Sequence, residues 1–314
     1  MTENLFNKAI QELRQKNIPA AEKILLKLIK KKPNHAQSLN LLGLISFQEK
    51  KDIDNALNFF KKSVAYGSKD INSFIFGGIS AIQTGESKVA IDILEQGNTL
   101  FNHHRDIMYN LAIAYTNQKL YDLAIEMYQK CIQLNEKDYG AKINLANLYV
   151  ENEDFNKAEN IFKELLNFDQ PVVYKNYLSL LFKEKDYKES IQIAQKLITK
   201  ESNEENIITL LTAAVYSREY NYISELFKQY SHIDNKEFTY LKARNLININ
   251  KYDEAIELFE SSFCQDDLTN NEKYQNLYST ILLGYDESKI IEDKFSHLIS
   301  NNEGNLTVKK LYGI

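Results

Sequence analysis

The sequence predicts an all-α fold, an α-solenoid of about eight or nine stacked helical hairpins. Three observations favour this fold. A set of apolar residues recurs at a fixed spacing of 34 residues, a period typical of repeat proteins. Only ten glycines and three prolines occur in 314 residues, as expected for long helices joined by short turns. No linker or low-complexity segment interrupts the repeats, so we expect a single continuous array.

The repeat is clearest between Met108 and Phe162. Every position is displaced by 34 between two copies, one with Leu111, Ala112, Tyr115, Ala124 and Tyr128 and the other with Leu145, Ala146, Tyr149, Ala158 and Phe162. Within each copy the apolar residues have helical spacing and form two stripes, one on each helix. Small side chains at Ala112 and Ala124 would let two antiparallel helices approach closely, with the polar segment Asn117–Lys119 as their turn.

This unit resembles the tetratricopeptide repeat family, whose unit is a helical hairpin of this length with small residues at its eighth and twentieth positions. Counted from Arg105, Ala112 is the eighth residue and Ala124 is the twentieth. The resemblance implies a right-handed superhelix in which the first helix of each hairpin lines a concave groove.

We expect hairpin units near residues 2–35, 36–70, 71–104, 105–138, 139–170, 171–203, 204–235, 236–268 and 269–300, followed by a C-terminal tail at 301–314. The second unit is one residue longer than its neighbours, and we place the extra residue in the turn Lys50–Asp54. In the third unit, the paired Gly77 and Gly78 each cost about 1 kcal/mol of helix propensity. Close contact between helices is the expected compensation.

After Pro171 the repeat pattern weakens but persists. One aromatic residue still recurs at gaps of 32 to 34 residues, at Tyr121, Phe155, Tyr187, Tyr220, Tyr252 and Tyr285. The ninth unit, with Tyr285 and Ser288, is degenerate. We expect it to cap the array, because a terminal repeat needs one polar outer face.

The composition limits the possible partners and compartments. The formal net charge is −5, which disfavours nonspecific binding to nucleic acid or to anionic membranes. Only two cysteines occur, Cys131 and Cys264, so a reducing compartment fits best. The N-terminus has no continuous apolar core, and no apolar run approaches the length of a membrane span. We therefore expect a cytoplasmic protein with no nucleic-acid partner and no membrane insertion.

No motif for catalysis, for a cofactor or for a metal is found in the sequence. His103 and His104 form a lone pair in an expected turn, without further ligands at metal-binding spacing. Cys131 falls at the twenty-seventh position of its unit, normally small and buried, and no histidine is placed to activate it. We therefore expect no catalytic residue, no metal and no cofactor, and a protein that is not an enzyme.

The positions that line the groove in the resembled family give the candidate binding residues. In the N-terminal half they are mostly apolar, namely Leu44, Phe47, Ile75, Ile79, Tyr109 and Ile113. If exposed, this row exceeds the apolar surface that a soluble monomer usually leaves open. Either a partner's amphipathic helix docks there, or superhelical curvature or another copy of the chain covers the row. Toward the C-terminus the groove positions become polar, with Asn147, Lys175 and Arg244.

Asn110, Asn144 and Asn176 fall at the sixth position of consecutive units. Such a row resembles the asparagine ladder of the repeat domain in O-linked GlcNAc transferases, in which a row of amides could pair with an extended peptide backbone. Alternatively, these asparagines only satisfy neighbouring helices. The carboxylate clamp of chaperone-binding family members is not matched by any three consecutive units.

These expectations together predict a non-catalytic interaction scaffold or adaptor that binds a protein or peptide ligand in its groove. Two alternatives stay open at this point. The chain could be the targeting or regulatory subunit of a separately encoded enzyme, such as a transferase, or it could be a self-assembling structural protein. An RNA-binding helical repeat is disfavoured by the acidic charge and the apolar groove.

Overall fold

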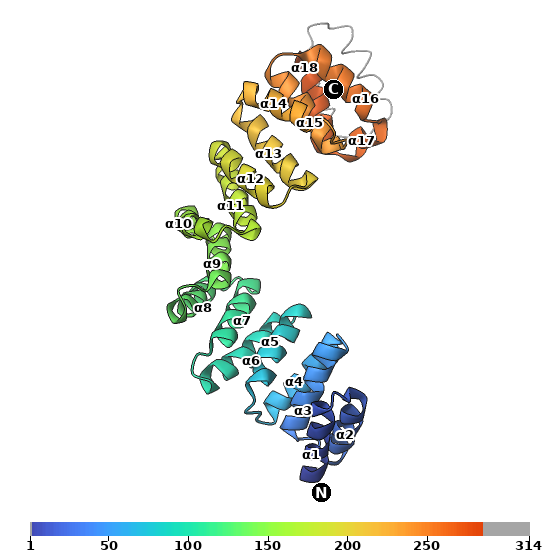
Figure 1. Cartoon of the computed structure of the whole chain (residues 1–314), viewed down its shortest axis with the longest axis vertical. Helices are drawn as coiled ribbons and strands as arrows, with labels where there is room; N and C mark the ends of the chain where they lie inside the picture. Colours follow the sequence, from blue (N-terminus) through green and yellow to red (C-terminus); the bar gives the residue numbers. More distant parts are fainter. Residues whose placement is uncertain (1, 285–314) are drawn as a thin grey trace, which may run out of the picture. The chain divides into compact units, whose positions relative to one another are not determined.

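The computed structural model describes residues 2–284, except for the side chains of Asn221, Gln265, Asp266 and Thr269. Within that range the chain consists of helices joined by short turns, and no strand occurs there (Figure 1). The predicted all-α repeat fold is confirmed. The chain divides into two compact units, the first ending at Asn167 and the second beginning at Phe168.

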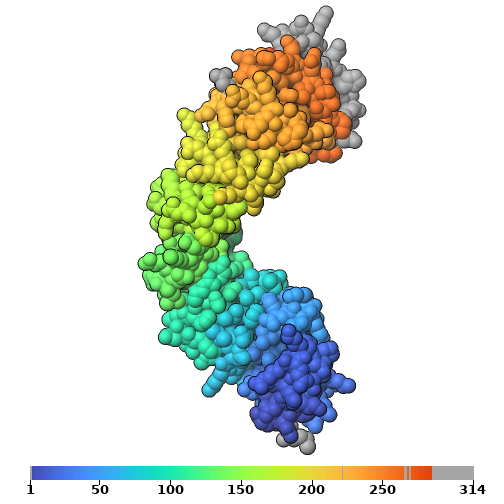
Figure 2. Space-filling view, viewed as in Figure 1, coloured from blue at the N-terminus to red at the C-terminus, as the bar shows by residue number. Residues whose placement is uncertain are grey.

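The first unit contains five helical hairpins. Their helices are α1 (Thr2–Arg14) with α2 (Ile18–Lys31), α3 (Ala36–Leu44) with α4 (Ile53–Ala65), α5 (Ile71–Gln83) with α6 (Ser87–Leu100), α7 (Arg105–Asn117) with α8 (Tyr121–Leu134), and α9 (Tyr139–Glu151) with α10 (Phe155–Leu165). A π-helical turn, η1 (Ile45–Glu49), extends α3, and a 3-10 turn, η2 (Leu166–Phe168), follows α10. Each hairpin packs against the next one along the chain, as the succession of colours from blue to green shows (Figure 2).

The second unit contains three further hairpins and two additional helices. These are α11 (Pro171–Glu184) with α12 (Tyr187–Lys200), α13 (Glu204–Ser217) with α14 (Tyr220–Gln229), α15 (Lys236–Asn248) with α16 (Tyr252–Ser262), and then α17 (Gln265–Asn270) and α18 (Glu272–Gly284). The six-residue α17 has no counterpart among the predicted helices. The expected second helix of the ninth unit, with Tyr285 and Ser288, and the expected tail at 301–314 lie outside the described residues.

Small residues allow the two helices of a hairpin to pack closely. Ala112 and Ala124 are both fully buried, as the repeat pattern predicted. The glycines act in the same way, because a Cβ atom at Gly78 would lie 2.5 Å from the Leu94 Cγ atom. At Gly77 the nearest atom to such a Cβ would be Phe60 Cβ on α4 of the preceding hairpin, at 3.1 Å, so this glycine allows close packing between hairpins. Close helix contact therefore explains the paired glycines of the third hairpin.

The extra residue of the second hairpin lies inside its first helix, so its predicted place in the turn Lys50–Asp54 was wrong. The Lys50 backbone N–H donates to the Ile45 carbonyl five residues back, at 3.2 Å, which is the π-helical pattern. The turn Lys50–Asp52 keeps the three-residue length of the other turns in this unit. Two features fix that turn: Lys51 has a φ of 55°, and the Asp52 carboxylate caps α4 by accepting from the Asn55 N–H.

Every turn inside the eight hairpins contains one residue in the left-handed region. These residues are Lys16, Lys51, Gly85, Lys119, Glu153, Lys185, Arg218 and Asn250, with φ between 55° and 79°. Only Gly85 is a glycine, although this backbone conformation costs other residues about 1 kcal/mol. The sharp reversal between paired helices is therefore held by packing of the helices on either side.

The first helices of the second, third and fourth hairpins lie next to one another in the first unit. Helix α3 contacts α5 and α5 contacts α7, whereas no contact of that extent joins α4 with α6 or α6 with α8. We call the surface formed by α1, α3 with η1, α5, α7 and α9 the groove face.

Candidate functional site

The predicted apolar row lies on the groove face. Leu44 is on α3, Phe47 on η1, Ile75 and Ile79 on α5, and Tyr109 and Ile113 on α7. All six side chains are half-buried, and none belongs to the largely exposed hydrophobic residues. Part of the covering comes from neighbouring hairpins, since the rings of Phe47 and Phe76 lie 5.2 Å apart. The row is therefore a shallow apolar surface, partly closed by the protein itself.

Tyr109 lies at the centre of a polar cluster that joins the fourth and fifth hairpins. Its hydroxyl accepts a hydrogen bond from the Asn144 side-chain amide at 2.9 Å. The Arg105 guanidinium lies 4.4 Å from the centre of the Tyr109 ring, a cation–π contact. Arg105 also forms an ion pair with Asp138, with 2.7 Å between Nε and Oδ2. The predicted residues Tyr109 and Asn144 are thus brought together by helices α7 and α9.

The side-chain amides of the predicted asparagine row all contact protein groups. Asn110 donates to the Asp106 carbonyl and Asn176 donates to the Val172 carbonyl, each at 2.7 Å and each within its own helix. Asn144 instead donates to Tyr109 of the preceding hairpin. An asparagine side chain has two amide hydrogens and an acceptor oxygen, so one such bond leaves it capacity to bind a peptide.

The remaining predicted residues occupy three first helices. Asn147 is half-buried on α9. Lys175 is exposed on α11 and forms an ion pair with Glu201 at 2.6 Å. Arg244 is half-buried on α15.

A row of aromatic rings and cations in the second unit includes Arg244. The Tyr187 and Tyr216 rings stack with their centres 5.3 Å apart, and the Arg244 guanidinium lies 4.7 Å from the Tyr216 ring centre. One Arg244 N–H donates to the Tyr240 hydroxyl at 3.1 Å. Lys273 Nζ lies 4.1 Å from the centre of the Tyr240 ring. The row therefore joins helices α12, α13, α15 and α18.

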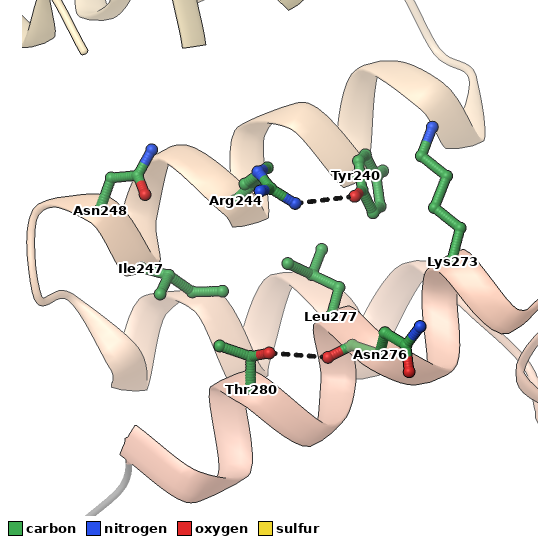
Figure 3. Close-up of a pocket in the computed structure, with 8 residues that line it drawn as sticks. All are labelled: Tyr240, Arg244, Ile247, Asn248, Lys273, Asn276, Leu277 and Thr280. Carbon is green, nitrogen blue, oxygen red and sulfur yellow. Dashed lines mark hydrogen bonds between the residues drawn. The ribbon is translucent and has the colours of Figure 1, made fainter. Parts of the chain in front are cut away.

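A pocket of about 310 Å³ opens beside Arg244, between α15 and α18 (Figure 3). Its lining residues are Tyr240, Arg244, Ile247, Asn248, Lys273, Asn276, Leu277 and Thr280. Sequence reasoning did not include Tyr216, Lys273 or Asn276 among the candidate site residues. The repeat period could not reveal Lys273 and Asn276, because the short helix α17 shifts α18 out of the regular spacing.

The described residues contain no group of histidine, cysteine, aspartate and glutamate side chains that could hold a metal ion. Cys131 is buried, and burial raises the pKa of its thiol to about 11, so it stays protonated at neutral pH. His104 caps α7, where its Nδ1 accepts from the Asp106 N–H at 3.3 Å. Among residues 2–284, no helix combines the length and the apolar character that crossing a bilayer requires.

Two tetratricopeptide repeat family models match the chain, at residues 6–70 and 118–181. A solved tetratricopeptide repeat protein from Parabacteroides merdae ATCC 43184 has a similar fold. It is 16% identical, with a TM-score of 0.53, and the match covers 90% of this chain and 98% of that one.

Two curated relatives match about half of this chain. The TPR repeat-containing protein YpiA of Bacillus subtilis (strain 168) is 24% identical over 170 residues, which are 53% of this chain and 40% of the relative. The human protein O-mannosyl-transferase TMTC3 is 29% identical over 170 residues, which are 52% of this chain and 18% of the human protein. The chain therefore spans less than half the length of these relatives.

Proposed function

We propose that the chain is an interaction scaffold whose groove face binds a helix or peptide of a partner protein. The reason is that the chain belongs to the tetratricopeptide repeat family. Proteins of this family are in general non-catalytic scaffolds that bind other proteins. The groove face is the part of this chain that we assign to that role.

The apolar row on three consecutive first helices carries the proposal. Leu44, Ile75, Ile79 and Ile113 are half-buried side chains on α3, α5 and α7, which lie side by side. A surface of this kind suits the apolar face of an amphipathic helix, which buries anchors spaced three or four residues apart. Burial of the partner's apolar side chains there would supply about 25 cal/mol for each Å² removed from water.

The polar residues beside the row are suited to fix the partner's register. Asn110, Asn144 and Asn147 lie on α7 and α9, next to the apolar positions Tyr109 and Ile113. Their amides can donate to and accept from the backbone of a bound segment. A site with apolar anchors and a few positioned amides selects a peptide by its shape and by hydrogen bonds to its backbone.

The test uses the full-length chain and a displayed library of random 15-residue peptides. Peptides enriched on the wild-type chain are synthesised, and their affinities are measured for wild type, Ile79→Asp and Leu134→Asp. Leu134 is the matched control, since it is 63% exposed at the end of α8, a second helix. We expect Ile79→Asp to weaken binding at least tenfold, about 1.4 kcal/mol, and Leu134→Asp to leave it unchanged. Equal affinities for wild type and Ile79→Asp would show that the groove face is not the binding surface.

A second candidate function is that of a targeting subunit for a separately encoded transferase. One observation favours it, namely that the human relative is named as an O-mannosyl-transferase, although the match covers only 18% of that protein. The test is affinity purification from the native source followed by an assay of the eluate for glycosyl transfer. A glycosyl-transferase that co-elutes with wild type but not with Ile79→Asp would support this role.

A further inference from the structure

We infer that the pocket between α15 and α18 binds a carboxylate group of a peptide partner, with Arg244 as the residue that recognises it. The inference rests on the proposed function, because it names the chemistry that the second unit would recognise in such a partner. It concerns a different surface from the groove face of the first unit, so the two proposals can fail separately.

Arg244 is held in a fixed orientation by two tyrosines. Its guanidinium lies 4.7 Å from the Tyr216 ring centre, and one of its N–H groups donates to the Tyr240 hydroxyl at 3.1 Å. A guanidinium carries five N–H donors in a plane, so four remain after the bond to Tyr240. Figure 3 shows the Arg244 side chain over the pocket, with Asn276 and Leu277 across from it on α18. A planar group fixed in this way needs little further ordering to bind a second planar group.

Within the part of the chain that the structure describes, the charges around the pocket leave Arg244 without a counter-ion. Lys273 is neutralised by Glu237, whose two carboxylate oxygens lie 2.6 and 2.8 Å from its Nζ atom. Among the described residues no carboxylate lies within ion-pair distance of Arg244, and no acidic side chain lines the pocket. The half-buried Arg244 guanidinium has lost part of its hydration. An incoming anion would replace the lost hydration with charge-assisted hydrogen bonds.

The other lining residues fit a small anionic group at the end of an apolar stem. Asn248 and Asn276 also line the pocket and carry side-chain amides, and Ile247 and Leu277 provide an apolar wall (Figure 3). A volume of about 310 Å³ accommodates one side chain or a chain terminus. A carboxylate matches the guanidinium fork with two parallel N–H to oxygen bonds. The ligand group is therefore either an Asp or Glu side chain or the C-terminal carboxylate of the partner.

The experiment follows the Arg244 Nε–Hε resonance of the ¹⁵N-labelled full-length chain, assigned by its loss in Arg244→Gln. Three acetyl-capped tetrapeptides are titrated at constant ionic strength: Ac-Ala-Ala-Leu-Glu-amide, Ac-Ala-Ala-Leu-Gln with a free C-terminus, and the neutral Ac-Ala-Ala-Leu-Gln-amide. The first presents a side-chain carboxylate and the second a terminal one. We expect at least one acidic peptide to give a saturating shift, and the neutral peptide to give none.

Affinity of the better acidic peptide is then measured for three variants. We expect Arg244→Gln to weaken binding at least tenfold, and Arg244→Lys to weaken it less, because a lysine keeps the charge but not the fork. Lys242→Gln is the matched control, since it removes an exposed cation from the same helix outside the pocket, and it should bind as wild type does. Circular dichroism checks that each variant keeps its helicity.

Two results would overturn the inference. One is that neither acidic peptide shifts the Arg244 resonance more than the neutral peptide does. The other is that Arg244→Gln or Arg244→Lys, with helicity intact, binds the acidic peptide as tightly as wild type. If selected peptides still require Ile79 in either case, the proposed function stands and only the carboxylate pocket is lost. If acidic peptides bind at Arg244 while Ile79→Asp has no effect on binding of the library-selected peptides, the carboxylate pocket stands and the groove face is lost as the binding surface.

Discussion

Arg105, the first residue of α7, and Asp138, the residue before α9, form a two-pronged ion pair between consecutive hairpins. Arg105 Nε donates to Asp138 Oδ2 at 2.7 Å, and an Nη donates to Oδ1 at 2.8 Å. Asp138 also caps α9 by accepting from the Ala141 N–H at 3.1 Å. Burial disfavours the charged form, but the hydrogen bonds from Arg105 and Ala141 outweigh burial and hold the pKa of Asp138 below its usual value. One carboxylate therefore both starts a helix and ties it to the preceding repeat.

We predict that Asp138→Asn lowers the free energy of unfolding by about 1.5–3 kcal/mol, because the variant keeps a capping oxygen but loses the two-pronged ion pair, which leaves Arg105 with only the more exposed Asp106 as a counter-ion. Urea unfolding followed by circular dichroism measures the change. The control is Glu126→Gln, which breaks the exposed pair with Lys130 and should cost no more than about 0.5 kcal/mol. An Asp138→Asn curve that superimposes on that of wild type would contradict the prediction.

A second prediction concerns pH and His35, which caps α3. Its Nδ1 accepts from the Ser38 N–H at 3.2 Å, and burial, together with nearby Lys32, lowers its pKa from the ordinary value of 6.5. A protonated ring cannot accept at Nδ1, so the folded chain favours the neutral form while the unfolded chain takes up a proton near pH 6.5. The contribution of His35 to stability is therefore complete above that pH and is lost as the pH falls below it.

The comparison of wild type with His35→Asn measures this effect, because asparagine caps helices without titrating. We expect the free energy of unfolding to fall more between pH 7.5 and pH 5.5 in wild type than in the variant. Equal pH dependence in the two proteins would exclude His35 as its source.

A third prediction concerns the asparagines of the groove face. The double variant Asn110→Ala, Asn144→Ala should weaken a selected peptide about tenfold while leaving the helical content intact, because each amide is expected to make a net contribution of about 1 kcal/mol or less to backbone pairing. Fluorescence anisotropy measures the affinity. Asn160→Ala, at an exposed position on α10, is the control and should not change it. Unchanged binding by the double variant would remove the asparagine row from the site.

A fourth prediction uses the left-handed turn residues. Lys119→Gly should stabilise the chain by about 0.5–1 kcal/mol, because glycine adopts its φ of 59° without strain. Gly85→Ala should destabilise it by about 1 kcal/mol through the backbone alone, since nothing lies within 4 Å of the added Cβ atom. Lys32→Gly, at a φ of −135°, is the control and should not stabilise the chain. The measurement is the urea concentration at the unfolding midpoint of each of the three variants. A Lys119→Gly variant that is no more stable than wild type would refute the prediction.

A fifth prediction separates a scaffold for other proteins from a self-assembling one. Light scattering over a concentration series should give a constant molar mass near 36.5 kDa. Half-buried groove residues such as Ile79 do not need a second copy to cover them. A mass that rises with concentration, and stops rising in Ile79→Asp, would assign the groove face to self-association instead.

The fold could be predicted from the sequence where a local pattern carries it. The burial of Ala112 and Ala124 follows from spacing alone, because two small residues twelve positions apart specify one hairpin. The position of the extra residue near Lys50 could not be predicted, since the choice between a longer turn and a wider helical turn depends on backbone hydrogen bonds.

Less of the candidate site than of the fold could be predicted from the sequence. Tyr109 and Asn144 were named from their repeat positions, but their mutual hydrogen bond depends on how two helices pack. The pocket beside Arg244 combines α15 with α18 after the irregular helix α17, so no fixed period links Lys273 to Arg244. A repeat pattern locates residues on a face, whereas their contacts across hairpins come from tertiary structure.

The wide turn η1 has a consequence for how such a chain can change its length. One residue inserted into a regular helix rotates all later side chains by about 100° around the axis. In Ile45–Glu49 that rotation is absorbed within five residues, and α4 still begins after a three-residue turn. A single-codon insertion in a first helix can therefore persist without changing how the next helix pairs. Deletion of one residue from this segment should restore the regular 34-residue unit.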